Sequence, residues 1–394
     1  MSRPPRIFDC DNHYYEARDA FTRHVPQAMQ PRCVQWAEVD GRMRHLLGGK
    51  LDLSVGNPLF DPIAPAGKLH EYYRGNPQGL PAAELMRGQL EPQPACYRDP
   101  AARLATLDEQ GVEAVWLFPT LGVLYEEPLK RDVEAVCALF QGFNRWLDED
   151  WGLACQGRLF AAPYISLADV DWACRELEWA LSRDARIFVM RPAAVFTAEG
   201  PRSPADPHFD PFWARVNEAG LTAVIHTGNS GYSTNGYASE GFGRASIGMS
   251  RRPSVKNLTL GRAAQDWLFS VACDLLFERF GNLRVASVEN GSGFLPELLR
   301  NLHHAKERNP WHFQEDPEAL FRDHVYMSPF WEDDLEEVVS IMGGERVIFG
   351  SDWPHMEGLP QPRDILDEQA GLVADDSRRF LHDTTLALTQ RRPG

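Results

Sequence analysis

The residues best suited to chemistry in this sequence are acidic and histidine side chains that accompany short apolar segments. The first group lies in residues 7–16, IFDCDNHYYE, which include Asp9, Asp11, His13 and Glu16. Alternate residues of a β-strand point to the same face, so the first three of these side chains are expected on one side. Burying two carboxylates beside an imidazole is unfavourable unless a cation or hydrogen bonds satisfy them. The segment therefore favours a metal site over a solvated strand end with incidental charge.

Three further polar residues occur much later in the chain and follow apolar segments in the same way. His226, Glu289 and Asp352 each come at or just after the end of a predicted strand. A lone histidine after a strand is more often a hydrogen-bonded structural residue. The carboxyl ends of parallel strands, however, meet at one edge of a barrel, so these residues are expected to converge with Asp11 and His13. Together they predict a metal site.

The elements that would position these residues are short apolar strands that alternate with amphipathic helices. Eight such units indicate parallel strands and right-handed crossovers, and they predict an α/β protein with a closed (β/α)8 TIM barrel. A doubly wound open sheet is the alternative, but the first strand lacks a Gly-x-Gly-x-x-Gly turn. The predicted strands are 7–10, 114–118, 159–165, 186–190, 221–225, 284–288, 325–327 and 346–349, and the predicted helices are 100–110, 129–151, 170–181, 210–219, 262–280, 294–308, 332–342 and several within 362–390.

Two longer segments interrupt this alternation. Residues 26–94 are rich in proline, glycine and polar residues, and we predict an insertion or lid over the site with a small hairpin at 34–47. A long loop rich in glycine and serine begins at residue 227, after the fifth strand. The whole chain, 1–394, is predicted to be a single metal-dependent barrel domain.

Composition limits the partners and the compartment. The net charge of −16 argues against nucleic acid and against an anionic membrane surface, so a small-molecule substrate is expected. Seven scattered cysteines without a Cys-x-x-Cys spacing indicate neither a disulfide framework nor a zinc ribbon. No apolar run is long enough to span a membrane, and the first residues lack a signal region. We expect a cytoplasmic protein, with a homodimer as one option.

These motifs resemble those of the amidohydrolase superfamily, in its branch of metal-dependent hydrolases and nonoxidative decarboxylases. The resemblance rests on the segments DCDNHYYE (9–16), VIHTG (224–228), VENGSGFLP (288–296) and FGSDWPHMEG (349–358). It implies that Asp11 and His13 form the ligand pair of the first strand. It likewise implies that His226 and Asp352 are metal ligands.

The sequence departs from the usual pattern of that superfamily at three places. Asp11 stands where typical members have a histidine, Met190 and Arg191 stand where a bridging lysine might be expected, and Glu289 replaces a histidine. The site is thereby enriched in carboxylates, which suits two iron ions better than one zinc ion. The pattern is similar to a TIM-barrel family of nonheme diiron monooxygenases from the biosynthesis of the diterpenoid antibiotics platensimycin and platencin.

This second resemblance implies a monooxygenase that uses two iron ions and dioxygen to hydroxylate an unactivated carbon. The implied substrate is apolar, diterpenoid-like and linked to coenzyme A, and the electrons come from an external donor. His303 is the alternative to His304 as a ligand, and Glu16 could equally cap or hydrogen-bond the opening loop. The implied ligands are Asp11, His13, His226 and Asp352 for one iron and Glu16, Glu289 and His304 for the other.

Other interpretations stay open. A single-metal hydrolase or decarboxylase would use one zinc or manganese ion, with Glu289 or Asp352 moving protons. A noncatalytic barrel with a vestigial site is the third. His355 is a candidate catalytic residue: His355 and Glu357 could act as a proton donor or as orienting partners of Asp352, or they belong to a well-tied loop. A basic cluster after the long loop could bind the phosphates of a coenzyme A ester, or it is a solvated charge run; its members are Arg251, Arg252 and Lys256.

Overall fold

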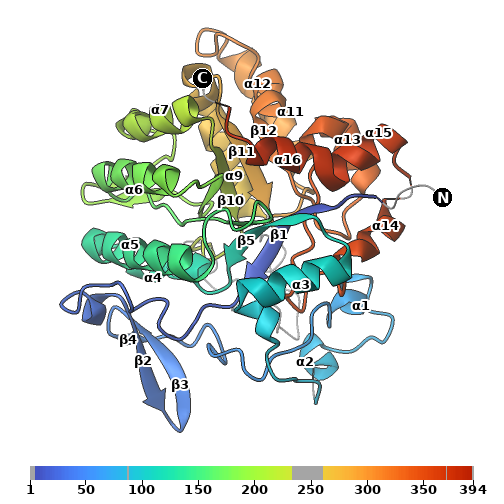
Figure 1. Cartoon of the computed structure of the whole chain (residues 1–394). Helices are drawn as coiled ribbons and strands as arrows, with labels where there is room; N and C mark the ends of the chain where they lie inside the picture. The colour runs from blue at the N-terminus through green and yellow to red at the C-terminus, as the bar shows by residue number, and fades with distance from the viewer. Residues whose placement is uncertain (1–4, 87, 233–260, 370, 393–394) are drawn as a thin grey trace.

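The computed structural model describes residues 5–86, 88–232, 261–369 and 371–392. Parallel strands lie at its centre and helices surround them (Figure 1). Two parallel sheets form this centre, one in the order β1-β5-β6 and the other in the order β12-β11-β10-β7. Their strands are β1 (Phe8–Tyr14), β5 (Ala114–Pro119), β6 (Leu159–Ala161), β7 (Ile187–Met190), β10 (Thr222–His226), β11 (Arg284–Val288) and β12 (Val325–Met327).

Single β-bridges link the two sheets. Tyr164 pairs with Val189, Met327 with Val347, and Asn12 with Trp353. Among the described residues, the predicted closed barrel is therefore found as two separate ladders joined by isolated bridges. The predicted eighth strand, 346–349, is not a strand of its own, although the Phe349 carbonyl accepts a hydrogen bond from the Cys10 N–H at 2.7 Å.

Two of the predicted helices begin and end where the sequence predicts, whereas the predicted helix 129–151 is found as α4 (Glu126–Leu129) and α5 (Val133–Asp150). The side chains of Asp99, Asp132 and Asp169 each accept a hydrogen bond from the backbone N–H three residues later, which caps α3 (Pro100–Gln110), α5 and α6 (Val170–Ser182). Gly111 and Gly220 adopt positive φ at the ends of α3 and α7 (Asp210–Ala219), a conformation that favours glycine. The predicted bounds of these two helices, 100–110 and 210–219, are confirmed.

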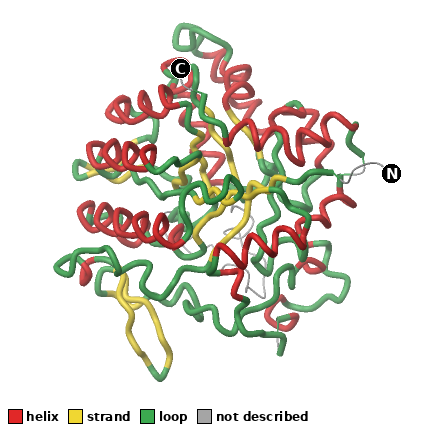
Figure 2. Tube along the Cα trace, viewed as in Figure 1, coloured by secondary structure: helices red, strands yellow, loops and turns green. Residues whose placement is uncertain are grey.

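The described helices surround the strands (Figure 2). The predicted helix 262–280 is divided into two, because Asp274 ends the first part and Leu275 takes a positive φ of 60°. The helices are α1 (His70–Tyr73), α2 (Ala82–Leu85), α3 (Pro100–Gln110), α4 (Glu126–Leu129), α5 (Val133–Asp150), α6 (Val170–Ser182), α7 (Asp210–Ala219), α9 (Arg262–Cys273), α10 (Leu276–Arg279), α11 (Leu295–Arg308), α12 (Pro317–His324), α13 (Leu335–Met342), α14 (Ile365–Glu368), α15 (Ala374–Arg378) and α16 (Thr384–Thr389).

The predicted hairpin in the segment 26–94 is confirmed. Strands β2 (Val34–Val39) and β3 (Arg42–Leu47) pair antiparallel and project from the helical body in Figure 1. The turn between them is Asp40-Gly41, with φ of 51° and 71°, as a two-residue hairpin turn requires. Strand β4 (Lys50–Leu51) extends this sheet, and β8 (Val195–Thr197) and β9 (Gly200–Arg202) form another small pair. The role of 26–94 as a lid stays a prediction.

The first strand is the most unusual part of the core. All seven residues of β1 are buried, including its two aspartates and its histidine. The pairing of β1 with β5 shifts register between Asp9 and Asn12, so the strand does not alternate regularly there. As a result, Asp9 and Asp11 have different surroundings, whereas the sequence predicts one shared face. None of the described helices is both long and apolar enough to cross a membrane.

Candidate metal centre

Four of the predicted ligands converge in one cluster at the carboxyl ends of three strands. Asp11 and His13 lie on β1, His226 ends β10, and Glu289 follows β11, and a ligand atom of each lies within 4.8 Å of the other three. The His226 Nε2 atom lies 3.4 Å from Asp11 Oδ1 and 3.3 Å from Glu289 Oε2. The His13 Nε2 atom lies 3.4 Å from Asp11 Oδ1. The structure thus brings these side chains together as the sequence predicts.

Asp352 completes this convergence from the segment after the Val347 bridge. Its Oδ1 atom lies 3.5 Å from His13 Nε2, and its backbone N–H donates to the Asp11 carbonyl at 2.9 Å. Asp352 and Glu289 both have a φ of 56°, in the left-handed region. This conformation costs non-glycine residues roughly 1 kcal/mol or more and is concentrated at functional sites. Both carboxylates therefore reach the cluster from residues whose backbone has a conformation that is unfavourable for side chains other than glycine.

His355 forms a pair with Asp352 at the edge of the cluster. The His355 Nδ1 atom lies 2.7 Å from Asp352 Oδ1, and its ring stacks on His13 with 4.0 Å between centroids. Its Nε2 atom lies 3.1 Å from the Thr120 hydroxyl, which donates its own proton to the Tyr14 carbonyl at 2.8 Å. Nε2 must therefore carry the proton, and in the neutral ring Nδ1 accepts one from Asp352. The pair can hold and exchange a proton.

The electrostatics of the cluster favour a cation. Burial opposes charge on Asp11, but His13 and His226 outweigh it and hold the pKa of this carboxyl well below its usual range. Burial also opposes protonation of His13, yet Asp11 and Glu289 raise its pKa to about 9. Burial and the neighbouring Glu289 raise the pKa of Asp352 well above its usual range. In the metal-free protein, protons bound to the cluster supply the positive charge that these carboxylates attract.

The hydrogen bonding of His13 tests whether the residues of the cluster fit a metal ion. Both of its ring nitrogens are buried, and neither has a hydrogen-bond partner among the described residues. Buried polar atoms are nearly always paired, so an unpaired imidazole among carboxylates fits a metal ligand. A donor set of carboxylate oxygens and imidazole nitrogens suits manganese, iron or zinc. The residues present therefore fit a divalent cation.

The structure does not bring Glu16 and His304 to this cluster. The Glu16 Oε1 atom accepts hydrogen bonds from the backbone N–H groups of Leu121 and Gly122 at 2.8 and 2.9 Å, so the carboxylate ties the opening segment to the turn after β5. The His304 side chain is 46% exposed on α11 and pairs with Glu307. The alternative, His303, is 57% exposed. The predicted second iron group is therefore not assembled among the described residues.

Glu357 is one further carboxylate of the cluster. A ligand atom of Glu357 lies within 4.8 Å of those of Glu289, Asp352 and His355. Burial, and then the charge of Glu289, raise its pKa to about 7. Its signal in the sequence is the motif DWPHMEG, which also contains Asp352 and His355. The predicted substrate residues Arg251, Arg252 and Lys256, and most of the loop after residue 227, lie outside the described residues.

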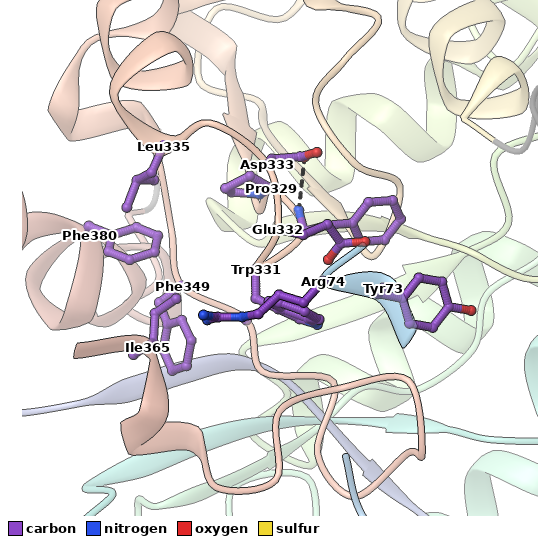
Figure 3. Close-up of a pocket in the computed structure, with 12 residues that line it drawn as sticks. Tyr73, Arg74, Pro329, Trp331, Glu332, Asp333, Leu335, Phe349, Ile365 and Phe380 are labelled. Carbon is purple, nitrogen blue, oxygen red and sulfur yellow. Dashed lines mark hydrogen bonds between the residues drawn. The ribbon is translucent and has the colours of Figure 1, made fainter. Parts of the chain in front are cut away.

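A cavity of about 350 Å³ lies beside the cluster. Figure 3 shows Trp331 and Arg74 next to one another on one wall, with Tyr73 beside them. The Trp331 indole N–H donates to the Glu357 carbonyl at 3.2 Å. Gly350 also lines the cavity, and a Cβ atom placed on it would lie 2.5 Å from Asp11 Cβ. At this point the backbone of Gly350 separates the cavity from Asp11.

Comparisons with known proteins agree with this geometry. The family model described as Amidohydrolase matches residues 69–388. The solved structure of an amidohydrolase from Mycobacterium avium subsp. paratuberculosis K-10 is 37% identical, with coverage of 99% of this chain and 100% of that chain and a TM-score of 0.92. No curated protein matches the chain.

Two decarboxylases share the fold at lower identity. A dihydroxybenzoic acid decarboxylase from Polaromonas sp. JS666, with bound manganese and the inhibitor 2-nitroresorcinol, is 15% identical, with coverage of 82% and 93% of the two chains and a TM-score of 0.56. A 5-carboxyvanillate decarboxylase from Novosphingobium aromaticivorans DSM 12444, complexed with manganese and 4-hydroxy-3-methoxy-5-nitrobenzoic acid, is 15% identical, with coverage of 98% and 95% and a TM-score of 0.60.

Proposed function

The chain belongs to the amidohydrolase family, and we propose that it catalyses the nonoxidative decarboxylation of a small carboxylic acid at a single divalent cation. The observation that carries this proposal is the buried cluster of Asp11, His13 and His226 with the Asp352–His355 pair at its edge. The fold shared with two manganese-containing decarboxylases supports it.

This proposal replaces the two-iron monooxygenase predicted from the sequence. The second iron would need Glu16 and His304, and neither belongs to the described groups whose ligand atoms lie within 4.8 Å of one another. The family and the similar structures name amidohydrolases and decarboxylases. Dioxygen, an external electron donor and a coenzyme A thioester gain no support from the described residues, so they form no part of the proposal.

The metal ligands would be Asp11, His13, His226 and Asp352. Manganese is the proposed cation, because both similar decarboxylases contain it and because it accepts mixed carboxylate and imidazole ligands. When bound, the cation supplies Lewis acidity toward oxygen atoms of the substrate. We propose that the positive charge of this cation selects an anionic substrate, since the surrounding side chains are mostly carboxylates.

The exposure of the side chains indicates where the substrate approaches. His13 and His226 are 1% exposed, whereas Glu289, Asp352 and His355 are 12–15% exposed. The open face of the cluster is therefore the side that carries these three residues. A substrate carboxylate bound there would lie next to the proton-holding pair.

The Asp352–His355 pair supplies what decarboxylation needs from the protein. The bond between the carboxylate and its carbon breaks, carbon dioxide leaves, and the electron pair stays on the substrate carbon. That carbon must then take a proton. The His355 imidazole can carry this proton at the open face, and its 2.7 Å contact with Asp352 orients the ring. We assign the delivery of this proton to the pair.

Hydrolysis is the second candidate, and it is favoured by the position of Glu289. Its carboxylate is 15% exposed and lies 3.3 Å from His226 Nε2. A carboxylate at the open face can take a proton from an attacking water molecule. The two candidates differ in their product, since only decarboxylation releases carbon dioxide.

The proposal is tested with purified protein loaded with Mn²⁺ under nitrogen. A panel of aromatic carboxylic acids, including dihydroxybenzoate and 5-carboxyvanillate, is incubated and the released carbon dioxide is measured. We expect release from at least one acid at the same rate with and without dioxygen. Consumption of dioxygen with a hydroxylated product, and no turnover under nitrogen, would contradict the proposal. Cleavage of an ester or amide without carbon dioxide would favour hydrolysis.

A further inference from the structure

Asp9 is fully buried in β1 and binds two segments of the chain at once. Its Oδ1 atom accepts hydrogen bonds from the backbone N–H groups of Asp11 and Ser351, at 3.0 and 2.9 Å. Its Oδ2 atom accepts from Asn12 Nδ2 and from the Ser351 hydroxyl, at 2.9 and 2.5 Å. Two donors thus belong to β1 and two to the residue before Asp352. All four contacts require an acceptor, which an ionised carboxylate provides.

Arg103 on α3 fixes the direction of the hydrogen bond from Asn12 to Asp9. This buried side chain donates to Asn12 Oδ1, to the His13 carbonyl at 2.7 Å and to the Cys96 carbonyl at 2.7 Å. A guanidinium can only donate, so the Asn12 oxygen must face Arg103 and the Asn12 amide nitrogen must face Asp9. Asp9 therefore has to accept at this position.

The same groups contact the backbone on both sides of the cluster. The guanidinium of Arg103 lies over the ring of Trp353, 4.8 Å from its centroid, and Trp353 directly follows Asp352. The Ser351 hydroxyl accepts a hydrogen bond from the Trp353 N–H at 3.0 Å. The Arg103 contact with the His13 carbonyl fixes the first strand at a residue of the cluster.

We propose that Asp9 is a positioning residue for the metal centre. Together with Asn12 and Arg103 it forms a one-directional chain of hydrogen bonds, which we call the relay. The relay joins the segment that carries Asp11 and His13 to the segment that carries Asp352. The inference rests on the proposed metal centre, but it does not depend on the reaction that the centre catalyses.

The relay makes a specific prediction for Asp9→Asn. The new amide nitrogen would face either the amide nitrogen of Asn12 or, with the amide turned over, the backbone N–H groups of Asp11 and Ser351, and two donors cannot pair. Asn12 cannot turn its side chain, because its own amide would then face the guanidinium of Arg103. The variant keeps the size of the side chain but loses the direction of the relay. Partners that orient metal ligands typically contribute about 10- to 100-fold to metal affinity, so we expect a loss of this size.

The double variant Asp9→Asn/Asn12→Asp restores the direction. The carboxylate at position 12 accepts from both Arg103 and the amide at position 9. The remaining amide hydrogen can bond to the Ser351 hydroxyl, which can donate to the Asp11 carbonyl 3.4 Å away. Formal charge and side-chain size are unchanged from the wild-type protein. We therefore expect metal affinity to return to within about threefold of the wild-type value, because the orienting contacts are restored.

The matched control is Glu176→Gln. Glu176 is a buried carboxylate on α6 that accepts hydrogen bonds from Asn144 Nδ2 at 2.9 Å and from Arg145. This pair resembles the Asp9–Asn12 pair in chemistry but lies in the helical layer. We expect Glu176→Gln to lower the melting temperature without changing metal affinity. It separates a general loss of stability from a loss of ligand position.

The experiment measures Mn²⁺ binding by calorimetry and the electron paramagnetic resonance spectrum of bound Mn²⁺ in the full chain. Weakened binding in Asp9→Asn, recovery in the double variant and an unchanged control are expected. Wild-type affinity in folded Asp9→Asn, or a double variant no better than it, overturns the relay. If Asp9→Asn does not fold, Ser351→Ala removes one of the four donors, and unchanged affinity in that variant overturns it. Wild-type protein that binds no Mn²⁺ would instead contradict the proposed centre itself.

Discussion

Gly350→Ala is the perturbation whose effect the structure defines most directly. A Cβ atom at this position would lie 2.5 Å from Asp11 Cβ and 2.6 Å from Ser328 Oγ. Carbon atoms pack favourably at about 3.5–4.0 Å, so Asp11 would have to retreat by roughly 1 Å. Metal–ligand distances tolerate only about 0.2 Å. The substitution should therefore displace a ligand by several times what coordination allows.

The expected magnitude follows from this displacement. Overpacking of this kind costs about 1–3 kcal/mol of folding free energy, so the protein should stay folded with a lower melting temperature. Metal affinity should fall by at least the roughly 10- to 100-fold that a disturbed ligand partner causes. The assay is Mn²⁺ titration by calorimetry, with circular dichroism as the check on folding.

Gly281→Ala provides the matched control. Apart from its chain neighbours, no atom of the described residues lies within 4 Å of a Cβ placed on Gly281, so the same methyl group meets open space there. This variant should bind Mn²⁺ as the wild-type protein does. Wild-type affinity in a folded Gly350→Ala variant would refute the placement of Asp11 as a ligand behind Gly350.

Further predictions concern the proton-holding pair, the metal and pH. His355→Gln should lower kcat by about 100-fold or more while metal content stays the same, because the pair loses its proton carrier; steady-state kinetics and metal analysis check this. Removal of metal with a chelator should abolish turnover, and added Mn²⁺ at 100 times its Kd should restore it and stabilise the fold by about 2.7 kcal/mol, seen as a higher melting temperature. The pKa of His13 in the metal-free protein is about 9, because Asp11 and Glu289 raise it against burial. Below that pH a cation must displace the His13 proton, so Mn²⁺ affinity should increase with pH and level off above about pH 9; affinity that is flat from pH 6 to 9 would contradict this.

Local signals in the sequence were sufficient for much of the scaffold. The bounds of α3 follow from the capping Asp99 and from Gly111, which takes the left-handed conformation that ends a helix. The hairpin follows from its Asp40-Gly41 turn. The convergence of Asp11, His13, His226, Glu289 and Asp352 follows from the rule that carboxyl ends of parallel strands share an edge.

The exposed position of His304 follows from the helical periodicity of α11. The buried face of α11 carries Leu295, Leu298, Leu299 and Leu302. At about 100° per residue, His304 lies roughly 200° around the helix from Leu302, which directs it away from the core. For His304, helical periodicity is therefore a better guide than the family resemblance.

Other features depend on tertiary contacts that no local pattern encodes. The partners of Glu16 are backbone groups more than a hundred residues away, so its role could not be read from the opening segment. The register shift in β1 breaks the alternation that would place Asp9 beside Asp11. The eighth segment shows that an apolar run does not always form a full strand, since Val347 makes only a single bridge.

The central claim is that one divalent cation binds at the cluster of Asp11, His13, His226 and Asp352. The most direct measurement is the number of metal ions per chain, determined by elemental analysis after equilibrium dialysis against Mn²⁺. We predict one ion per chain in the wild-type protein and none in folded His226→Ala. Two ions per chain, or full metal content in that variant, would contradict the claim.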